Sequence, residues 1–264
     1  MTAVRCTAEE RALARASIYR LLALTFTYPT PAVLEATDRA IEVAAVAAPL
    51  VDEAVVAGVT ALAAARAAAS PGDQETSFQH VFTLSYSEDS PPYETAFSAT
   101  HIFQQTAQQA DLAGFYRAFG VDPQSERPDH IATELEFAYL LALKEAHARA
   151  HAEPEHVGIV RDAERTFLRD HLARWAPQIG QRIAVAAGRT PLGAAGRLLI
   201  AFDAAEERFL RLGAIARYRD EPVLIADEPG DMSCPLEDVV VAPEVLDLPF
   251  FDSREEAFRV PANS

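Results

Sequence analysis

The sequence predicts an all-α fold, a single compact domain of about nine or ten helices with an irregular C-terminal tail. Half of the 264 residues are hydrophobic. Alanine, leucine, arginine and glutamate, which lose little rotamer freedom in a helix, are frequent. Apolar residues also recur at steps of three and four, as they do at Leu198, Phe202, Ala205, Phe209 and Leu212. No alternating strand pattern of convincing length accompanies them.

Capping signals place the helices in the first third of the chain. Thr7 is expected to cap a helix that runs to about Phe26. Thr30, followed by a proline, starts a second helix, and a third helix begins near Asp52. The run at residues 70–73, Ser-Pro-Gly-Asp, is a break before a fourth helix.

Prolines divide the middle of the chain. The two adjacent prolines at residues 91–92 forbid a continuing helix and predict a loop. A helix from about Ala99 to Phe119 is expected to follow this loop. Pro128 is then expected to open a long helix that ends near Ala152, with the next two residues in its first turn.

Three further helices are expected before the tail. Pro154 starts the first of them, and Trp175 marks its joint to a shorter helix that ends at Gly188. Thr190, again followed by a proline, starts the last long helix.

The composition changes after about Tyr218. Residues 1–218 are expected to form the helical domain, and residues 219–264 a proline-rich tail of acidic and apolar residues, draped over the domain or mobile. The three valines at residues 239–241 are the only weak candidate for a strand.

Charge and cysteine usage restrict the class of protein. A net charge of −16 argues against a nucleic-acid binder and suits a basic partner. Cys6 and Cys234 lie near opposite ends of the chain, which favours a reducing compartment over a disulfide framework. The first residues lack an apolar signal segment, and no run of about 18 apolar residues exists. The expected location is the cytoplasm, without stable membrane insertion.

Enzymatic chemistry finds little support in the sequence. Neither a glycine-rich phosphate loop nor a nucleophile elbow is present. His130 and Glu134 are four residues apart and are expected to share a helical face and a hydrogen bond, whereas Glu136 diverges from Glu134 by about 200°. A metal-dependent hydrolase using His130 and Glu134 is therefore one alternative.

A loose histidine cluster and one helix start complete the candidates. His147, His151 and His156 are interpreted first as a solvated helix end and only second as metal ligands. Asp129 suits the first turn of a helix, where it would satisfy free backbone N–H groups.

Five segments, in this order, resemble the TorD/DmsD family of cytoplasmic chaperones for molybdenum oxidoreductases. They are residues 16–22, 78–82 with the Pro-Pro-Tyr-Glu-Thr loop at 91–95, 115–121, 128–137 and 167–177. The segment 128–137, Pro-Asp-His followed by Glu-Leu-Glu-Phe, is the most specific. The resemblance covers about residues 8 to 214; Tyr93 stands where relatives also carry a tryptophan, and the tail has no family pattern.

The resemblance implies a chaperone and not an enzyme. Such proteins bind the twin-arginine signal peptide of an apo molybdenum oxidoreductase catalytic subunit, hold back its export and keep it able to receive molybdopterin guanine dinucleotide. No resident cofactor is expected; transient contact with that cofactor or a guanine nucleotide stays open, as does the choice between a monomer and a helix-exchanged dimer. A helical scaffold without signal-peptide binding is a further alternative. The residues implied in client binding are Pro92, Tyr93, Glu94, Pro128, Asp129, His130 and Glu134, with Asp129 as the partner of an arginine.

Overall fold

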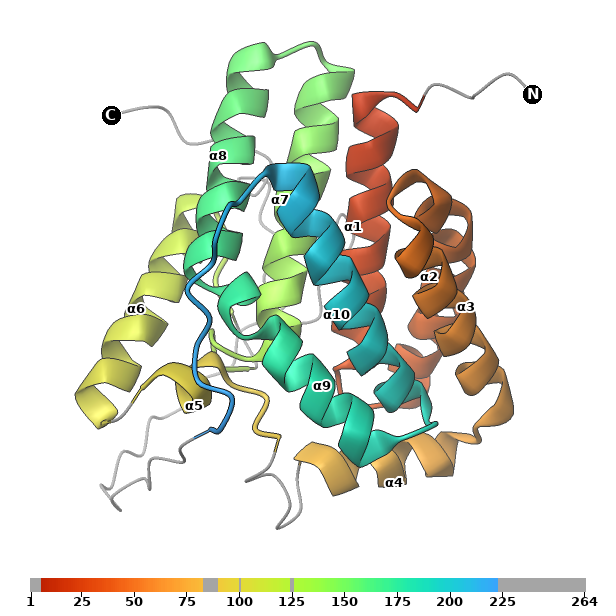
Figure 1. Cartoon of the computed structure of the whole chain (residues 1–264). Helices are drawn as coiled ribbons and strands as arrows, with labels where there is room; N and C mark the ends of the chain where they lie inside the picture. The colour runs from red at the N-terminus through yellow and green to blue at the C-terminus, as the bar shows by residue number, and fades with distance from the viewer. Residues whose placement is uncertain (1–5, 83–89, 100, 124–125, 223–264) are drawn as a thin grey trace, which may run out of the picture.

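The computed structural model describes residues 6–82, 90–99, 101–123 and 126–222, and these form the predicted all-α fold (Figure 1). Ten α-helices and two short 3-10 helices lie in the described part of the chain, where Tyr93 and His130 form an isolated β-bridge and no strand occurs. The predicted valine run at residues 239–241, and the tail beyond residue 222, lie outside the described residues.

Of the first four helices, three follow the predicted capping signals, and the fourth begins at Pro71, inside the break predicted at residues 70–73. The four helices are α1 (Ala8–Thr25), α2 (Pro31–Ala47), α3 (Glu53–Ala68) and α4 (Pro71–Phe82), with the 3-10 helix η1 (Ala48–Leu50) before α3. Thr7 forms a reciprocal capping box with Glu10. The side chains of Thr30 and Asp52 accept backbone N–H groups at the starts of α2 and α3. The capping residues in the sequence were therefore sufficient to predict where α1, α2 and α3 begin.

Two predicted boundaries in the middle of the chain are wrong. The helix expected from about Ala99 is divided into α5 (Glu94–Ser98) and α6 (Ile102–Ala118). Ala99 has an extended backbone, and the ring Nδ1 of His101 accepts the N–H of Gln104 to cap α6. The long helix expected from Pro128 starts three residues later, as α7 (Ile131–Ala150), with His130 as its N-cap.

The remaining helices are α8 (Pro154–Asp170), η2 (Leu172–Arg174), α9 (Ala176–Ala187) and α10 (Pro191–Leu210). Thr190 caps α10, as predicted, by accepting the N–H of Gly193. Trp175 is fully buried at the joint between η2 and α9. No single helix among the described residues is long and apolar enough to cross a membrane; the pair α3 and α4, bent by 117°, passes on length and composition alone.

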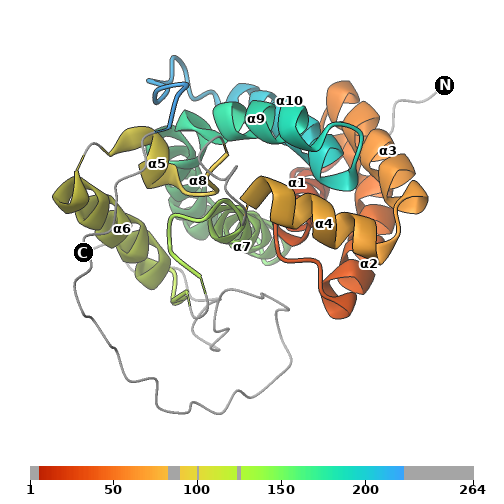
Figure 2. The same cartoon turned by 90° about the horizontal axis from the view of Figure 1, so that it is seen from below.

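Helix α7 lies at the centre, with α1 and α8 on either side of it, and α9 and α10 cross over one face (Figures 1 and 2). Helices α2 and α3 cover the α1 side, and α6 lies on the opposite side, beyond α8. Helices α9 and α10 approach closely at Gly180 and Gly196. A Cβ atom added to Gly196 would lie 2.6 Å from the backbone oxygen of Gly180.

A buried ion cluster joins α1, α7, α8 and α10. The guanidinium of Arg15, 1% exposed, donates from Nε and Nη2 to Glu206 at 2.8 and 2.7 Å. It also pairs with Glu145 at 2.7 Å and Glu164 at 3.0 Å, and Tyr19 donates to Glu206. Burial is the largest influence on Glu164 and raises its pKa to about 7, against the lowering effect of Arg15. The sequence did not indicate this cluster.

The segment after α10 returns across α8 and α9 toward α5 (Figure 1). The backbone N–H of Tyr218 donates to the backbone carbonyl of Arg174 at 2.9 Å. Arg219 donates to the carbonyl of Ser98 at 3.0 Å. The first residues beyond the predicted domain boundary at 218 therefore lie against the helical body.

Candidate functional site

The proline loop and the start of α7 run side by side in opposite directions. Tyr93 and His130 form an antiparallel β-bridge. The N–H of Glu94 donates to the carbonyl of Asp129, and the N–H of Ile131 donates to that of Pro92, both at 2.8 Å. Backbone pairing therefore brings together loop residues and helix-start residues that are 35 or more positions apart in the sequence.

This pairing also explains why α7 does not begin at Pro128. The carbonyl of Pro128 accepts the hydroxyl of Tyr116 at 2.6 Å, so this residue lies in a tethered turn and not in a first helical turn. His130 has an extended backbone, with φ −77° and ψ 139°, as an N-cap requires. Asp129 is consequently not the helix cap that its position in the sequence predicts.

His130 is an uncharged cap at the base of the loop. Its ring Nδ1 accepts the N–H of Ala132 at 3.1 Å, which places the proton of the neutral ring on Nε2. The ring meets that of Tyr93 edge to face, with 5.4 Å between centroids. Burial, and then the nearby charge of Arg127, lower the pKa of His130 to about 3. At neutral pH the ring of His130 is therefore an uncharged aromatic group beside Tyr93.

Asp129 is fully buried and already holds a guanidinium. Arg127 donates from Nε to Oδ1 at 3.0 Å and from Nη2 to Oδ2 at 2.9 Å. The ring of Tyr93 faces the same guanidinium, with its Cζ 4.1 Å from the ring centroid. The hydroxyl of Thr95 donates to Oδ2 of Asp129 at 2.6 Å and lies 3.1 Å from Nη2 of Arg127. We call the three residues that surround the Arg127 guanidinium, Tyr93, Thr95 and Asp129, the arginine cage.

Glu94 and Glu134 are the other two acidic residues of the predicted site. Both are fully buried. Glu134 accepts the indole N–H of Trp175 through Oε2 at 3.2 Å, and its Oε1 has no hydrogen-bond partner among the described residues. Burial, followed by the charge of Glu94, raises the pKa of Glu134 well above its ordinary value. The hydrogen bond expected between Glu134 and the histidine four residues earlier is replaced by the bond to Trp175, because that histidine is a cap with extended backbone.

Glu94 joins α5 to the segment after α10. It accepts the hydroxyl of Tyr218 at 2.9 Å and lies 3.2 Å from Nδ1 of His171. Tyr218 in turn is covered by the guanidinium of Arg174, 3.9 Å from its ring centroid. The carboxylate of Glu94 therefore links α5, the end of α8 and the segment after α10, and it stabilises their packing.

Arg127 and Thr95 were not assigned to the site from the sequence. His171 and Tyr218 were not connected with it either. A cue existed for Arg127, since it is two residues from Asp129 in a segment that cannot be helical throughout. No local cue pointed to Thr95, His171 or Tyr218, because their partners are distant in sequence.

The other candidates lie elsewhere. The rings of His147 and His151 stack with centroids 4.1 Å apart, and His156 bonds to Glu153. No group of three His, Cys, Asp or Glu side chains in the described part of the chain is placed to hold a metal ion.

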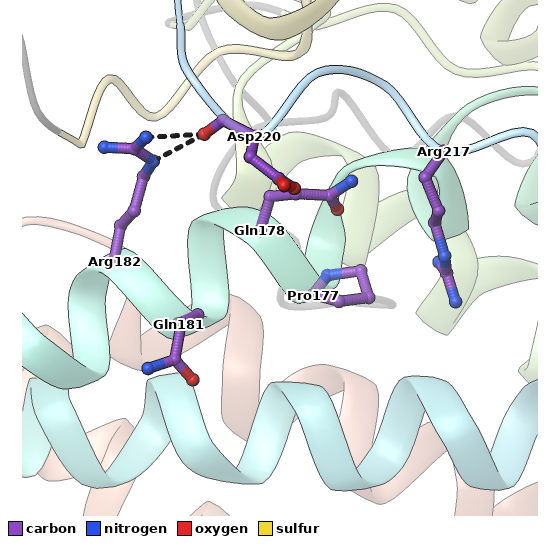
Figure 3. A pocket seen from close by; sticks show the side chains of 6 residues that line it. All are labelled: Pro177, Gln178, Gln181, Arg182, Arg217 and Asp220. Atoms are coloured by element: carbon purple, nitrogen blue, oxygen red, sulfur yellow. Dashed lines mark hydrogen bonds between the residues drawn. The ribbon is translucent and has the colours of Figure 1, made fainter.

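An open pocket on α9 is separate from the arginine cage (Figure 3). In Figure 3, Arg182 of α9 donates to the backbone oxygen of Asp220, with the Nε bond at 3.0 Å. None of the client-binding residues implied by the sequence lines this pocket. Its lining residues are Pro177, Gln178, Gln181, Arg182, Arg217 and Asp220.

Three curated relatives are assembly chaperones by name. The perchlorate reductase assembly chaperone protein of Dechloromonas aromatica (strain RCB) is 32% identical over 108 residues, covering 39% of this chain and 47% of the relative. The chlorate reductase assembly chaperone protein of Ideonella dechloratans is 41% identical over 80 residues, and the selenate reductase assembly chaperone protein of Thauera selenatis is 40% identical over 80 residues. Each of these two matches covers 28% of this chain and 38% of the relative, so every match spans less than half of the relative's length.

These names denote assembly proteins and not catalysts, in agreement with the expectation that the chain is not an enzyme. The model of a family described as nitrate reductase delta subunit matches residues 48–180, half of the chain, and this span contains the whole arginine cage. The chain therefore belongs to the nitrate reductase delta subunit family, and so to the TorD-type chaperones that its motifs resemble.

Proposed function

We propose that the protein is an assembly chaperone for a molybdenum-containing oxidoreductase. In this proposal it acts in the cytoplasm on the apo catalytic subunit, binds the twin-arginine leader of that subunit, holds back its export and keeps it able to receive its cofactor. The relatives named above assemble perchlorate, chlorate and selenate reductases by their names, which supports a reductase as the client.

The arginine cage is the observation that supports the proposed binding of the leader. A carboxylate that accepts two parallel N–H bonds, below an aromatic ring, recognises a guanidinium by shape as well as by charge. Asp129 and Tyr93 provide both elements around Arg127. A leader with two arginines presents that same group, and the net charge of −16 favours the approach of a basic peptide.

The test is titration calorimetry with the synthetic twin-arginine leader of a molybdenum oxidoreductase. We expect micromolar or tighter binding, and much weaker binding of the same peptide with both arginines replaced by lysine, because lysine cannot make the bidentate contact. No heat with this and several other twin-arginine leaders would remove leader binding from the proposal.

Asp129→Asn is the matched variant of the cage. We expect it to weaken leader binding about 10- to 100-fold, since a hydrogen bond to a charged group contributes about 1.5–3 kcal/mol. Asp162→Asn is the control, because Asp162 is 78% exposed and pairs only with Arg165 three residues along α8 among the described residues. Circular dichroism should show the same helicity for both variants.

A further inference from the structure

The cage is occupied by a residue of the protein itself. Arg127 makes two parallel bonds to Asp129, at 3.0 and 2.9 Å, and lies against the face of Tyr93. The side-chain amide of Gln109 reaches the same guanidinium, and with its oxygen turned inward it accepts from Nη2 at 2.8 Å. These are the contacts that an arginine from another chain would need.

Burial differs sharply between the two partners. The carboxylate of Asp129 is 0% exposed, whereas the side chain of Arg127 is 38% exposed. A buried, ionised carboxylate without a counter-charge is strongly unfavourable, so a cation at this position stabilises the ionised form of Asp129. The cation, being on the solvent side, is the partner that can leave and be replaced.

The positions of Asp129 and Tyr93 in the cage do not depend on Arg127. Asp129 is held by the hydroxyl of Thr95 at 2.6 Å and, through its carbonyl, by the N–H of Glu94 at 2.8 Å. Tyr93 is fixed by its bridge to His130. If Arg127 swings out, the carboxylate and the ring therefore stay in place for another guanidinium.

We propose that Arg127 is an exchangeable internal occupant, which a leader arginine displaces from Asp129 when the client binds. The inference rests on the leader-binding function proposed above. One guanidinium replaces another, so the buried carboxylate keeps a counter-charge before and after exchange. Arg127 thereby lowers the affinity for every leader, and only a guanidinium of suitable geometry competes with it.

The experiment uses the full chain, Arg127→Ala, and N-acetyl-arginine amide as a probe of the cage. The variant leaves Asp129 unpaired, so we expect a lower Tm than that of the unsubstituted protein. Millimolar N-acetyl-arginine amide should restore part of the lost Tm, while the lysine amide should not. Neither amide should change the Tm of the unsubstituted protein or of the Arg127→Ala/Asp129→Asn double variant.

Leader affinity provides the second readout. If the cage is free of Arg127 about a tenth of the time, Arg127→Ala should bind the twin-arginine leader about tenfold more tightly. Arg127→Lys is the companion variant, because it keeps a positive charge near Asp129 and so folds even where alanine does not. We expect it also to bind the leader more tightly than the unsubstituted protein.

The outcomes separate the two proposals. Equal effects of the arginine and lysine amides, or leader affinity unchanged or weakened in both variants, would show that Arg127 is a fixed structural ion and overturn the exchange, even if the unsubstituted protein binds leaders. Selective rescue by the arginine amide, with no leader binding by any form, would support the exchangeable cage and overturn the leader-binding function.

Discussion

Replacing His130 by asparagine is expected to remove the loss of stability that this histidine causes between about pH 7 and pH 5. His130 is 6% exposed, and burial lowers its pKa to about 3 from an ordinary value of 6.5. Between these two values the unfolded chain binds a proton at this residue and the folded protein does not. The stability that His130 contributes is therefore complete above the unfolded pKa and is lost as the pH falls toward the folded pKa.

The magnitude follows from the distance between the working pH and the unfolded pKa. At pH 5 an unfolded histidine is about 1.5 pH units below its pKa, which corresponds to about 2 kcal/mol of the free energy of unfolding. At pH 7 the same contribution is only a few tenths of a kcal/mol. Asparagine carries no proton in this range, and its side-chain oxygen can still cap α7.

Urea denaturation of both proteins at the two pH values measures the effect. Glu164, whose burial raises its pKa to about 7, titrates in the same range with the opposite sign, because its folded form binds the extra proton. Both proteins contain Glu164, so its contribution cancels in the comparison. Equal losses of stability from pH 7 to pH 5 in the two proteins would refute the assignment to His130.

Three further substitutions test the packing around the site and the core. Arg15→Ala should lower the free energy of unfolding by about 3–5 kcal/mol, because it leaves buried Glu164 and Glu206 without their cation; a loss below about 1 kcal/mol would contradict this. Gly196→Ala should destabilise by about 1–3 kcal/mol, since its Cβ would lie 2.6 Å from a backbone oxygen of α9. The control Gly158→Ala, with open space around it in α8, should instead stabilise by up to about 1 kcal/mol, and thermal unfolding distinguishes the two signs. Tyr218→Phe should cost about 1–3 kcal/mol in urea denaturation, because buried Glu94 loses a donor, and an unchanged midpoint would count against that bond.

Helix boundaries were predictable where the capping partner is close in sequence. Thr7, Thr30 and Thr190 each bond to an N–H three residues ahead, so a window of four residues contains the whole interaction. The start of α7 was mispredicted because its determinant is not local. Asp129 and His130 pair with the loop at Tyr93, and the carbonyl of Pro128 accepts from Tyr116. No short window around Pro128 contains these partners.

The resemblance implied that Tyr93, Asp129 and His130 belong to one region, and the backbone pairing brings them together in the structure. Their role in client binding stays a prediction. Sequence spacing could not show that Glu94 and Glu134 are fully buried and bonded to Tyr218 and Trp175, because these partners are distant in the sequence. It also could not show that the arginine partner of Asp129 is already present two residues away.

The protein holds two arginines by carboxylates, and their surroundings assign them different roles. Arg15 is 1% exposed and is enclosed by carboxylates from three helices, so no guanidinium from solvent can reach its position while the bundle is folded. Arg127 is 38% exposed and, among the described residues, has one carboxylate partner, Asp129, in a cage that is open on one side. The arginine–carboxylate contact is therefore fixed at Arg15 and exchangeable at Arg127. Added N-acetyl-arginine amide should accordingly restore Tm to Arg127→Ala and leave that of Arg15→Ala unchanged, which makes the buried arginine the internal control for the exposed one.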